Sequence, residues 1–273
     1  MFELLQYPFI QNALIAGSLV AVIAAVTGYF LIARGLTFAG HALPNIGFAG
    51  AAGAVFIGVR PVYGLFAFTI LAAAGIGLDG QAARERDIAV GVLMTFALGL
   101  GLMFLSLYAG YAQRVYGILF GTILGISRQD VSLTAVAALL ITAAMILFYR
   151  PLLFSTFDPA VAEARGVPVR FLAVAFLVVV ALAVSLAVQL MGALLVFTLL
   201  IGPAATATRL VRRPGRAILV AALLGVAYIW IGILLAAETA DLPVSFFIAA
   251  LAFIVYLPVR FLVKGRREGK TVV

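Results

Sequence analysis

Long apolar stretches follow one another along almost the whole chain, separated by short polar connections. Most stretches are close to the roughly 20 residues that an α-helix needs to cross a bilayer. The apolar run that begins at Phe171 is too long for one crossing, so we divide it near Met191–Gly192. The pattern predicts nine membrane-spanning helices: Pro8–Ala33, Ala39–Gly58, Pro61–Leu78, Ile88–Tyr108, Val131–Tyr149, Phe171–Leu190, Gly192–Thr208, Ala217–Ala237 and Pro243–Leu262.

The segment Val115–Ile126 is apolar but too short to cross a bilayer alone. We expect it to be a re-entrant or interfacial helix. Gly117, Gly121 and Gly125 recur every four residues and would give it a smooth face for close packing.

Composition supports a membrane protein of the all-α class. Hydrophobic residues make up 66% of the chain and charged residues 10%, whereas soluble domains have about 45–50% and about 25%. The alternating pattern of a transmembrane barrel is missing. The sequence has no cysteine, which excludes disulfides and thiolate metal sites. Glu3 and the lack of a basic leader indicate that the first apolar stretch is retained as a span.

The charges predict the topology. The formal net charge is +8, and in such an apolar chain basic residues usually set orientation rather than bind nucleic acid. With the C-terminus inside the cell, all but three of the 18 Lys and Arg fall on the inner side; the exceptions are Arg60, Arg114 and Arg128. We therefore predict an outer N-terminus and an inner C-terminus, and a single membrane domain over residues 1–273.

Catalysis is nearly excluded by the motifs. The sequence has no HExxH, no G-x-S-x-G and no paired carboxylates, and its lone His41 has no triad partners at recognisable spacing. The tail Gly265–Thr271 resembles the end of a phosphate-binding loop, but it lacks the glycine spacing and the flanking strand and helix. We predict that the protein is not an enzyme and that any ATP it uses is hydrolysed by another chain.

The long connection Arg150–Arg170 contains the signals of a short helix. Asp158 is a candidate N-cap, Pro159 suits the first helical position, and Gly166 ends the segment. A capped helix on the inner side of the membrane is a docking element, although a structured connector is the plainer alternative.

Four stretches resemble the permease subunits of bacterial ABC importers for divalent metals, the zinc and manganese uptake family. They are GHALPNIGFAGA (residues 40–51), YGILFGTILGIS (116–127), FDPAVAEARGV (157–167) and MGALLVFTLLIGPAATA (191–207). The third and fourth are the more specific, and all four occur in the family's order.

The resemblance implies a multi-pass protein of the bacterial cytoplasmic membrane that works as a homodimer. It also implies a separate ABC ATPase, an extracytoplasmic solute-binding protein, alternating access driven by ATP, and no tightly bound cofactor beyond the transported Zn²⁺ or Mn²⁺. The residues implied to couple the permease to the ATPase are Phe157, Asp158, Pro159, Glu163, Arg165 and Gly166.

His41 is the candidate for the transport path. In the family motif an acidic residue stands one helical turn before the histidine, whereas this chain has Thr37. Thr37, His41 and Asn45 are spaced by four and share one helical face. An intramembrane ionisable residue is a functional candidate by default, although a histidine that only bonds a neighbouring helix is the alternative. We predict a weak, uncharged metal site, with Gln189, Glu238 and Asp241 near the outer mouth.

Three other functions stay open at this point. The same architecture would also suit a metal chelate or another small solute. A stand-alone secondary transporter or channel would need inverted repeats or a dense set of intramembrane charges, and a membrane-embedded enzyme would need a catalytic set. The sequence shows none of these last features.

Overall fold

Helices account for all the regular structure in the computed structural model, which describes residues 6–79, 83–108, 121, 125–239 and 242–268. Over these ranges the chain forms ten helices and no strand, which confirms the all-α prediction. The helices are α1 (Pro8–Ala33), α2 (Thr37–Phe56), α3 (Pro61–Leu78), α4 (Ala83–Leu107), α6 (Arg128–Phe157), α7 (Pro159–Ala164), α8 (Val169–Met191), α9 (Ala193–Leu210), α10 (Pro214–Thr239) and α11 (Val244–Glu268).

The nine long helices coincide with the nine predicted ones, but in the described residues only seven are long and apolar enough to span a bilayer by composition. The exceptions are α2 and α9. Helix α2 contains many glycine, alanine and polar residues, and α9 is only 18 residues long with a polar last turn. Both helices lie among the others, where protein rather than lipid covers much of their surface.

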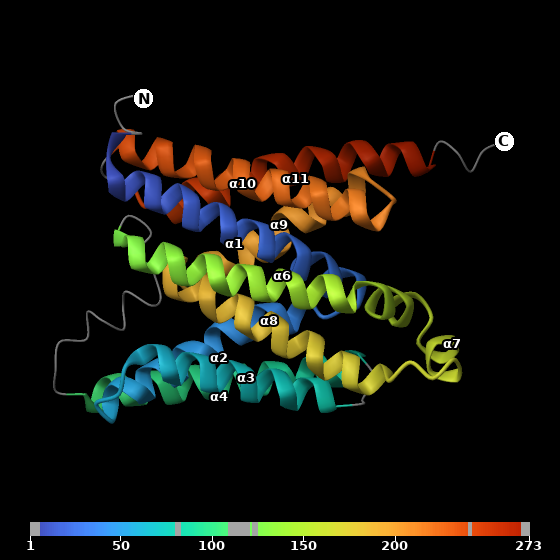
Figure 1. Ribbon diagram of the computed structural model, residues 1–273, viewed down its shortest axis with the longest axis horizontal. Coiled ribbons are helices and arrows are strands. Elements are labelled where there is room, and N and C mark those ends of the chain that lie inside the picture. Colours follow the sequence, from blue (N-terminus) through green and yellow to red (C-terminus); the bar gives the residue numbers. More distant parts are fainter. Residues whose placement is uncertain (1–5, 80–82, 109–120, 122–124, 240–241, 269–273) are drawn as a thin grey trace.

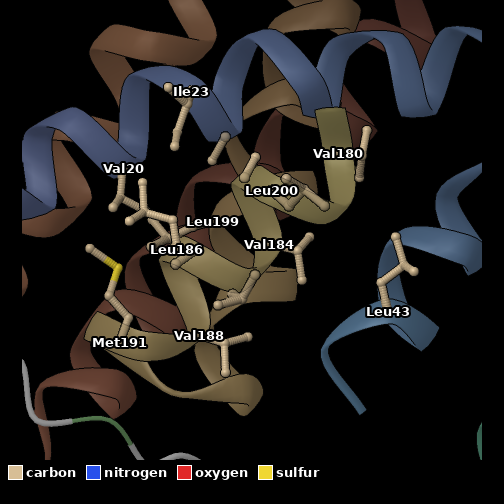
Figure 2. Packing of buried hydrophobic residues seen from close by; sticks show 14 of the residues in the cluster. Val20, Ile23, Leu43, Val180, Val184, Leu186, Val188, Met191, Leu199 and Leu200 are labelled. Atoms are coloured by element: carbon tan, nitrogen blue, oxygen red, sulfur yellow. The ribbon is translucent and has the colours of Figure 1, made fainter. Parts of the chain in front are cut away.

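The buried core lies where α1, α8 and α9 meet. Figure 1 shows α6 and α8 between two groups of helices, with α2, α3 and α4 on one side and α9, α10 and α11 on the other. The side chains that fill the centre are aliphatic (Figure 2) and include Val20 and Ile23 of α1, Val184 and Leu186 of α8, and Leu199 and Leu200 of α9.

Small residues allow the helix backbones to approach closely. A Cβ atom at Gly28 of α1 would overlap the carbonyl group of Leu200 in α9, and a Cβ atom at Gly64 of α3 would overlap the carbonyl group of Gly50 in α2. Glycine at such contacts is typical of membrane helix packing. These two contacts fix α9 against α1 and α2 against α3.

The predicted division near Met191–Gly192 is confirmed. Helix α8 ends at Met191, α9 begins at Ala193, and Gly192 between them has a φ of +83°, which a residue with a Cβ atom rarely adopts. Gly121 packs against this break, and the Asn12 Nδ2 atom donates a hydrogen bond to the Ile126 carbonyl oxygen at 3.0 Å.

Most of Val115–Ile126 lies outside the described residues, so its predicted re-entrant helix stays a prediction. Helix α4 nevertheless ends at the same end of the bundle as the one where α6 begins (Figure 1).

Several helix boundaries differ from the prediction by a few residues, and the largest difference is at the end of α6. Helix α6 does not end near Tyr149 but continues through Pro151 to Phe157. The proline removes one backbone hydrogen bond, yet the helix continues because Leu152 is buried against the bundle. The loop predicted to begin at Arg150 is thus reduced to the short helix α7 and its flanking residues.

Candidate functional site

A cavity of about 460 Å³ surrounds the only histidine of the chain. His41 lies in the first half of α2 and is partly buried. Its ring meets the Phe197 ring of α9 edge to face, with centroids 4.8 Å apart and an interplanar angle of 72°. The cavity lies between α2, α4 and α9, and its lining residues are Gly35, Thr37, Phe38, His41, Asp87 and Phe197.

The helical face predicted from the sequence is only partly directed at this cavity. Thr37 and His41 both line it. Asn45 lies one turn further along and is engaged elsewhere: its Nδ2 atom donates to the His41 carbonyl oxygen at 2.9 Å and lies 3.7 Å from the Met94 Sδ atom. Pro44 also lacks the amide that would bond the Gly40 carbonyl. The polar side chains that α2 contributes to the cavity lining are therefore those of Thr37 and His41, beside the Phe38 ring.

Sequence reasoning missed Asp87. This residue lies one turn into α4, and the fold brings it to the same cavity as His41. Its Oδ1 atom lies 3.9 Å from the Arg86 Nε atom, and its side chain is 43% exposed. The available signal was an acidic residue at the start of a span, at the membrane end where His41 was also expected. Thr37 and Asp87 thus add oxygen atoms from two different helices to the imidazole nitrogen.

The described residues contain no group of three or more His, Cys, Asp or Glu side chains suited to hold a metal ion. A tightly held structural metal usually has four protein ligands. In the described residues the cavity around His41 therefore offers fewer ligands than such a structural site.

The coupling segment Phe157–Gly166 forms the helix that the sequence predicted. The Asp158 Oδ1 atom accepts a hydrogen bond from the Val161 amide at 3.0 Å, and Pro159 occupies the first helical position. Gly166 follows with a φ of +80° and donates its amide to the Glu163 carbonyl at 2.9 Å.

The segment presents a mixed surface to its surroundings. Phe157 is 69% exposed, while Ala162 is fully buried and anchors α7 to the bundle. Glu163 is exposed, and the Arg165 guanidinium lies 5.8 Å from the Phe154 ring centroid. An exposed aromatic ring beside charged side chains is typical of a docking surface.

Arg34 connects the two regions. It caps the C-terminus of α1, three residues before Thr37, and its Nη1 atom donates to the Ser155 and Thr156 hydroxyl oxygens, both at 3.1 Å. Ser155 and Thr156 lie in the last turn of α6, just before the coupling segment. Burial lowers the pKa of Arg34, and the nearby positive charge of Arg86 lowers it further.

The residues predicted at the outer mouth lie far from this cavity. Gln189 is partly buried in the last turn of α8, and Glu238 is exposed near the end of α10. Both are at the end of the bundle opposite to α7 (Figure 1). Asp241 lies outside the described residues.

The model of the ABC 3 transport family matches residues 6–263. The manganese transport system membrane protein MntC of Halalkalibacterium halodurans is 37% identical over 225 residues, 82% of this chain and 77% of the relative. The high-affinity zinc uptake system membrane protein ZnuB of Haemophilus influenzae is 29% identical over 215 residues, 78% of this chain and 80% of the relative. Among solved structures, PsaBC from Streptococcus pneumoniae in complex with Fab superposes with a TM-score of 0.83 at 28% identity, covering 94% of this chain and 93% of that one.

Proposed function

Because this chain belongs to the ABC 3 transport family, we propose that it is the membrane-spanning permease of an importer for a divalent metal, Mn²⁺ ahead of Zn²⁺. The observation that carries the proposal is the cavity around His41, together with the relative named as a manganese transport protein. In this reading the metal is cargo, and the permease holds no cofactor of its own.

The donor atoms favour Mn²⁺. Carboxylate and water oxygens suit Mn²⁺, whereas thiolates and imidazoles are typical ligands of Zn²⁺. The chain has no cysteine, and the cavity offers one imidazole among oxygen donors. A transit site must also release its ion, so few ligands are an advantage rather than a defect.

The ATPase would dock on the coupling segment Phe157–Gly166. The segment lies at the basic end of the bundle, with the exposed Phe157 ring as an apolar anchor. The bias of basic residues places this end in the cytoplasm by the positive-inside rule. The N-terminus and the mouth near Gln189 and Glu238 would then face outward, toward the solute-binding protein.

A second copy of the chain would complete the path. Three neighbouring hollows share lining residues: Phe38 and Asp87 link the hollow on α4 to the His41 cavity, and Phe197 links that cavity to a hollow between α9 and α11. A hollowed face of this kind exposes the cavity unless another subunit covers it. We therefore place the homodimer interface on this face, so that two His41 cavities lie beside one central path.

The test is uptake of radioactive Mn²⁺ by cells that express the chain with its ATPase and solute-binding protein. Uptake should depend on the chain and on ATP hydrolysis. His41→Ala should lower uptake by about tenfold or more, because it removes the only nitrogen ligand of the cavity. Ser106→Ala, which changes an exposed residue toward the opposite end of α4, is the matched control and should transport normally. Wild-type cells that take up neither Mn²⁺ nor Zn²⁺ would contradict the proposal.

A further inference from the structure

The negative charge of the His41 cavity comes from one residue of a different helix. Of the residues that line the cavity, only Asp87 is acidic, and Thr37 and His41 carry no formal negative charge. We infer that Asp87 is the carboxylate that binds the cation beside His41 and sets the affinity of the path for Mn²⁺. This inference rests on the proposed function and adds to it a residue that neither the sequence motif nor the predicted helical face contains.

A divalent cation needs such a charge at this place. The cavity walls include the Phe38 and Phe197 rings, and a cation that leaves water for apolar surroundings loses hydration energy. Neutral donors restore only part of that energy, whereas a carboxylate oxygen is a preferred ligand of hard cations and also lowers the net charge of the complex. Within the cavity lining, Asp87 alone meets both requirements.

The carboxylate of Asp87 is not held by a strong ion pair. The Arg86 Nε atom lies 3.9 Å from Oδ1, beyond hydrogen-bonding distance. The Arg86 Nη2 atom instead donates to the Gly35 carbonyl oxygen at 3.1 Å. This bond holds the guanidinium against the turn between α1 and α2. A loose pair at a partly exposed position contributes little energy, so an arriving cation can displace it.

The same geometry explains how Thr37 is tolerated one turn before His41. Helix α4 packs along α2, and this packing carries Asp87 to the cavity that Thr37 also lines. A carboxylate on α4 therefore replaces one that α2 lacks. Moving the carboxylate onto α2 should therefore restore the Mn²⁺ affinity that is lost when it is removed from α4.

The experiment uses the whole transporter, reconstituted with its ATPase and solute-binding protein, and measures initial rates of Mn²⁺ uptake over a range of Mn²⁺ concentrations. Asp87→Asn should raise the KM for Mn²⁺ by roughly 10- to 100-fold, the usual effect of losing a group that supports a metal site. Glu85→Gln is the matched control, because Glu85 lies two residues before Asp87 in α4, is exposed and does not line this cavity. It should leave the KM unchanged.

A rescue separates the charge of Asp87 from a role in folding. The double variant Thr37→Asp with Asp87→Asn should recover most of the Mn²⁺ affinity, since the new carboxylate enters the same cavity. Assembly with the ATPase and the melting temperature in detergent show whether each variant is folded.

The outcomes distinguish this inference from the proposed function. If wild-type transporter moves no metal, the proposed function fails. If wild type transports Mn²⁺ but Asp87→Asn has an unchanged KM, only the Asp87 assignment is overturned. A folded double variant that stays as impaired as Asp87→Asn would also overturn it, because the loss would then not be one of cavity charge.

Discussion

The coupling segment and the His41 cavity lie at the same end of the bundle but are built in opposite ways. The coupling segment is made of ten consecutive residues, and its defining hydrogen bonds join residues three apart, such as Asp158 to Val161. The cavity takes its walls from α2, α4 and α9, so Thr37 and Phe197, 160 positions apart in the sequence, line the same cavity. A local element keeps its shape when its surroundings move, whereas a cavity between helices changes when any wall moves. This difference suits a docking helix and a path that has to open and close.

The largest effect is expected from a substitution that disturbs the cavity and spares the coupling segment. Gly28→Ala would place a methyl group into the Leu200 carbonyl and force α9 away from α1. Overpacking of this kind costs about 1–3 kcal/mol or more, and it would displace Phe197 from His41. We expect a lower melting temperature in detergent and reduced Mn²⁺ uptake.

Gly99→Ala is the control for that experiment, because a Cβ atom at Gly99 meets no atom within 4 Å. It should keep or slightly raise the melting temperature, since alanine favours a helix more than glycine does. Equal melting temperatures for the two variants would show that the α1–α9 contact does not hold the cavity wall.

The next largest effect is expected at Arg34, whose side chain bonds the last turn of α6 beside the coupling segment. Arg34→Gln removes charged hydrogen bonds to Ser155 and Thr156, each worth about 1.5–3 kcal/mol when well buried and less at this partly exposed site. The two hydroxyls keep their own bonds to the Leu152 carbonyl, so no buried group is left unsatisfied. We therefore expect a folded transporter whose ATPase activity continues while uptake per ATP falls.

Arg212→Gln tests whether that result is specific. Arg212 is exposed in the connection between α9 and α10 at the same basic end of the bundle, so its loss changes the net charge equally. The ratio of Mn²⁺ transported to ATP hydrolysed should stay normal. If Arg34→Gln also leaves this ratio normal, the contact of α1 with α6 does not transmit motion between the regions.

The smallest effect should come from within the coupling segment. Asp158→Ala removes the N-cap of α7 at a cost of about 1 kcal/mol, while the cavity stays intact. Stimulation of the ATPase by the permease should weaken severalfold, and Asp158→Ser, which keeps a capping oxygen, should restore it. If Asp158→Ala stimulates the ATPase as strongly as the wild type does, binding of the ATPase is what keeps α7 helical.

Much of the fold could be predicted because each long helix is marked by its own hydrophobic stretch. The break between α8 and α9 was predictable for a second reason, since a single helix over the whole run would be too long for a bilayer. The continuation of α6 past Tyr149 could not be predicted. Arg150 and Pro151 are typical of a helix end, but the helix continues because Leu152 is buried against the bundle.

The candidate site likewise contains residues that the sequence predicted and a residue that it did not. The sequence pointed to His41 and Thr37 because residues four apart share a helical face. It also placed Asn45 on that face, but the amide of Asn45 bonds its own helix and approaches Met94 instead. Asp87 carried no motif, since its spacing to His41 means nothing until α2 and α4 are packed together.

By itself, the sequence determined that the chain enters a membrane, where its helices run and how its coupling helix is capped. These features depend on hydropathy and on hydrogen bonds between neighbouring residues, which act within a few positions. Only the tertiary structure decided which groups lie near His41 and that Arg34, after α1, bonds the last turn of α6 beside the coupling segment. Those contacts depend on how closely glycines let helices approach, and that depends on the shapes of residues far apart in the chain.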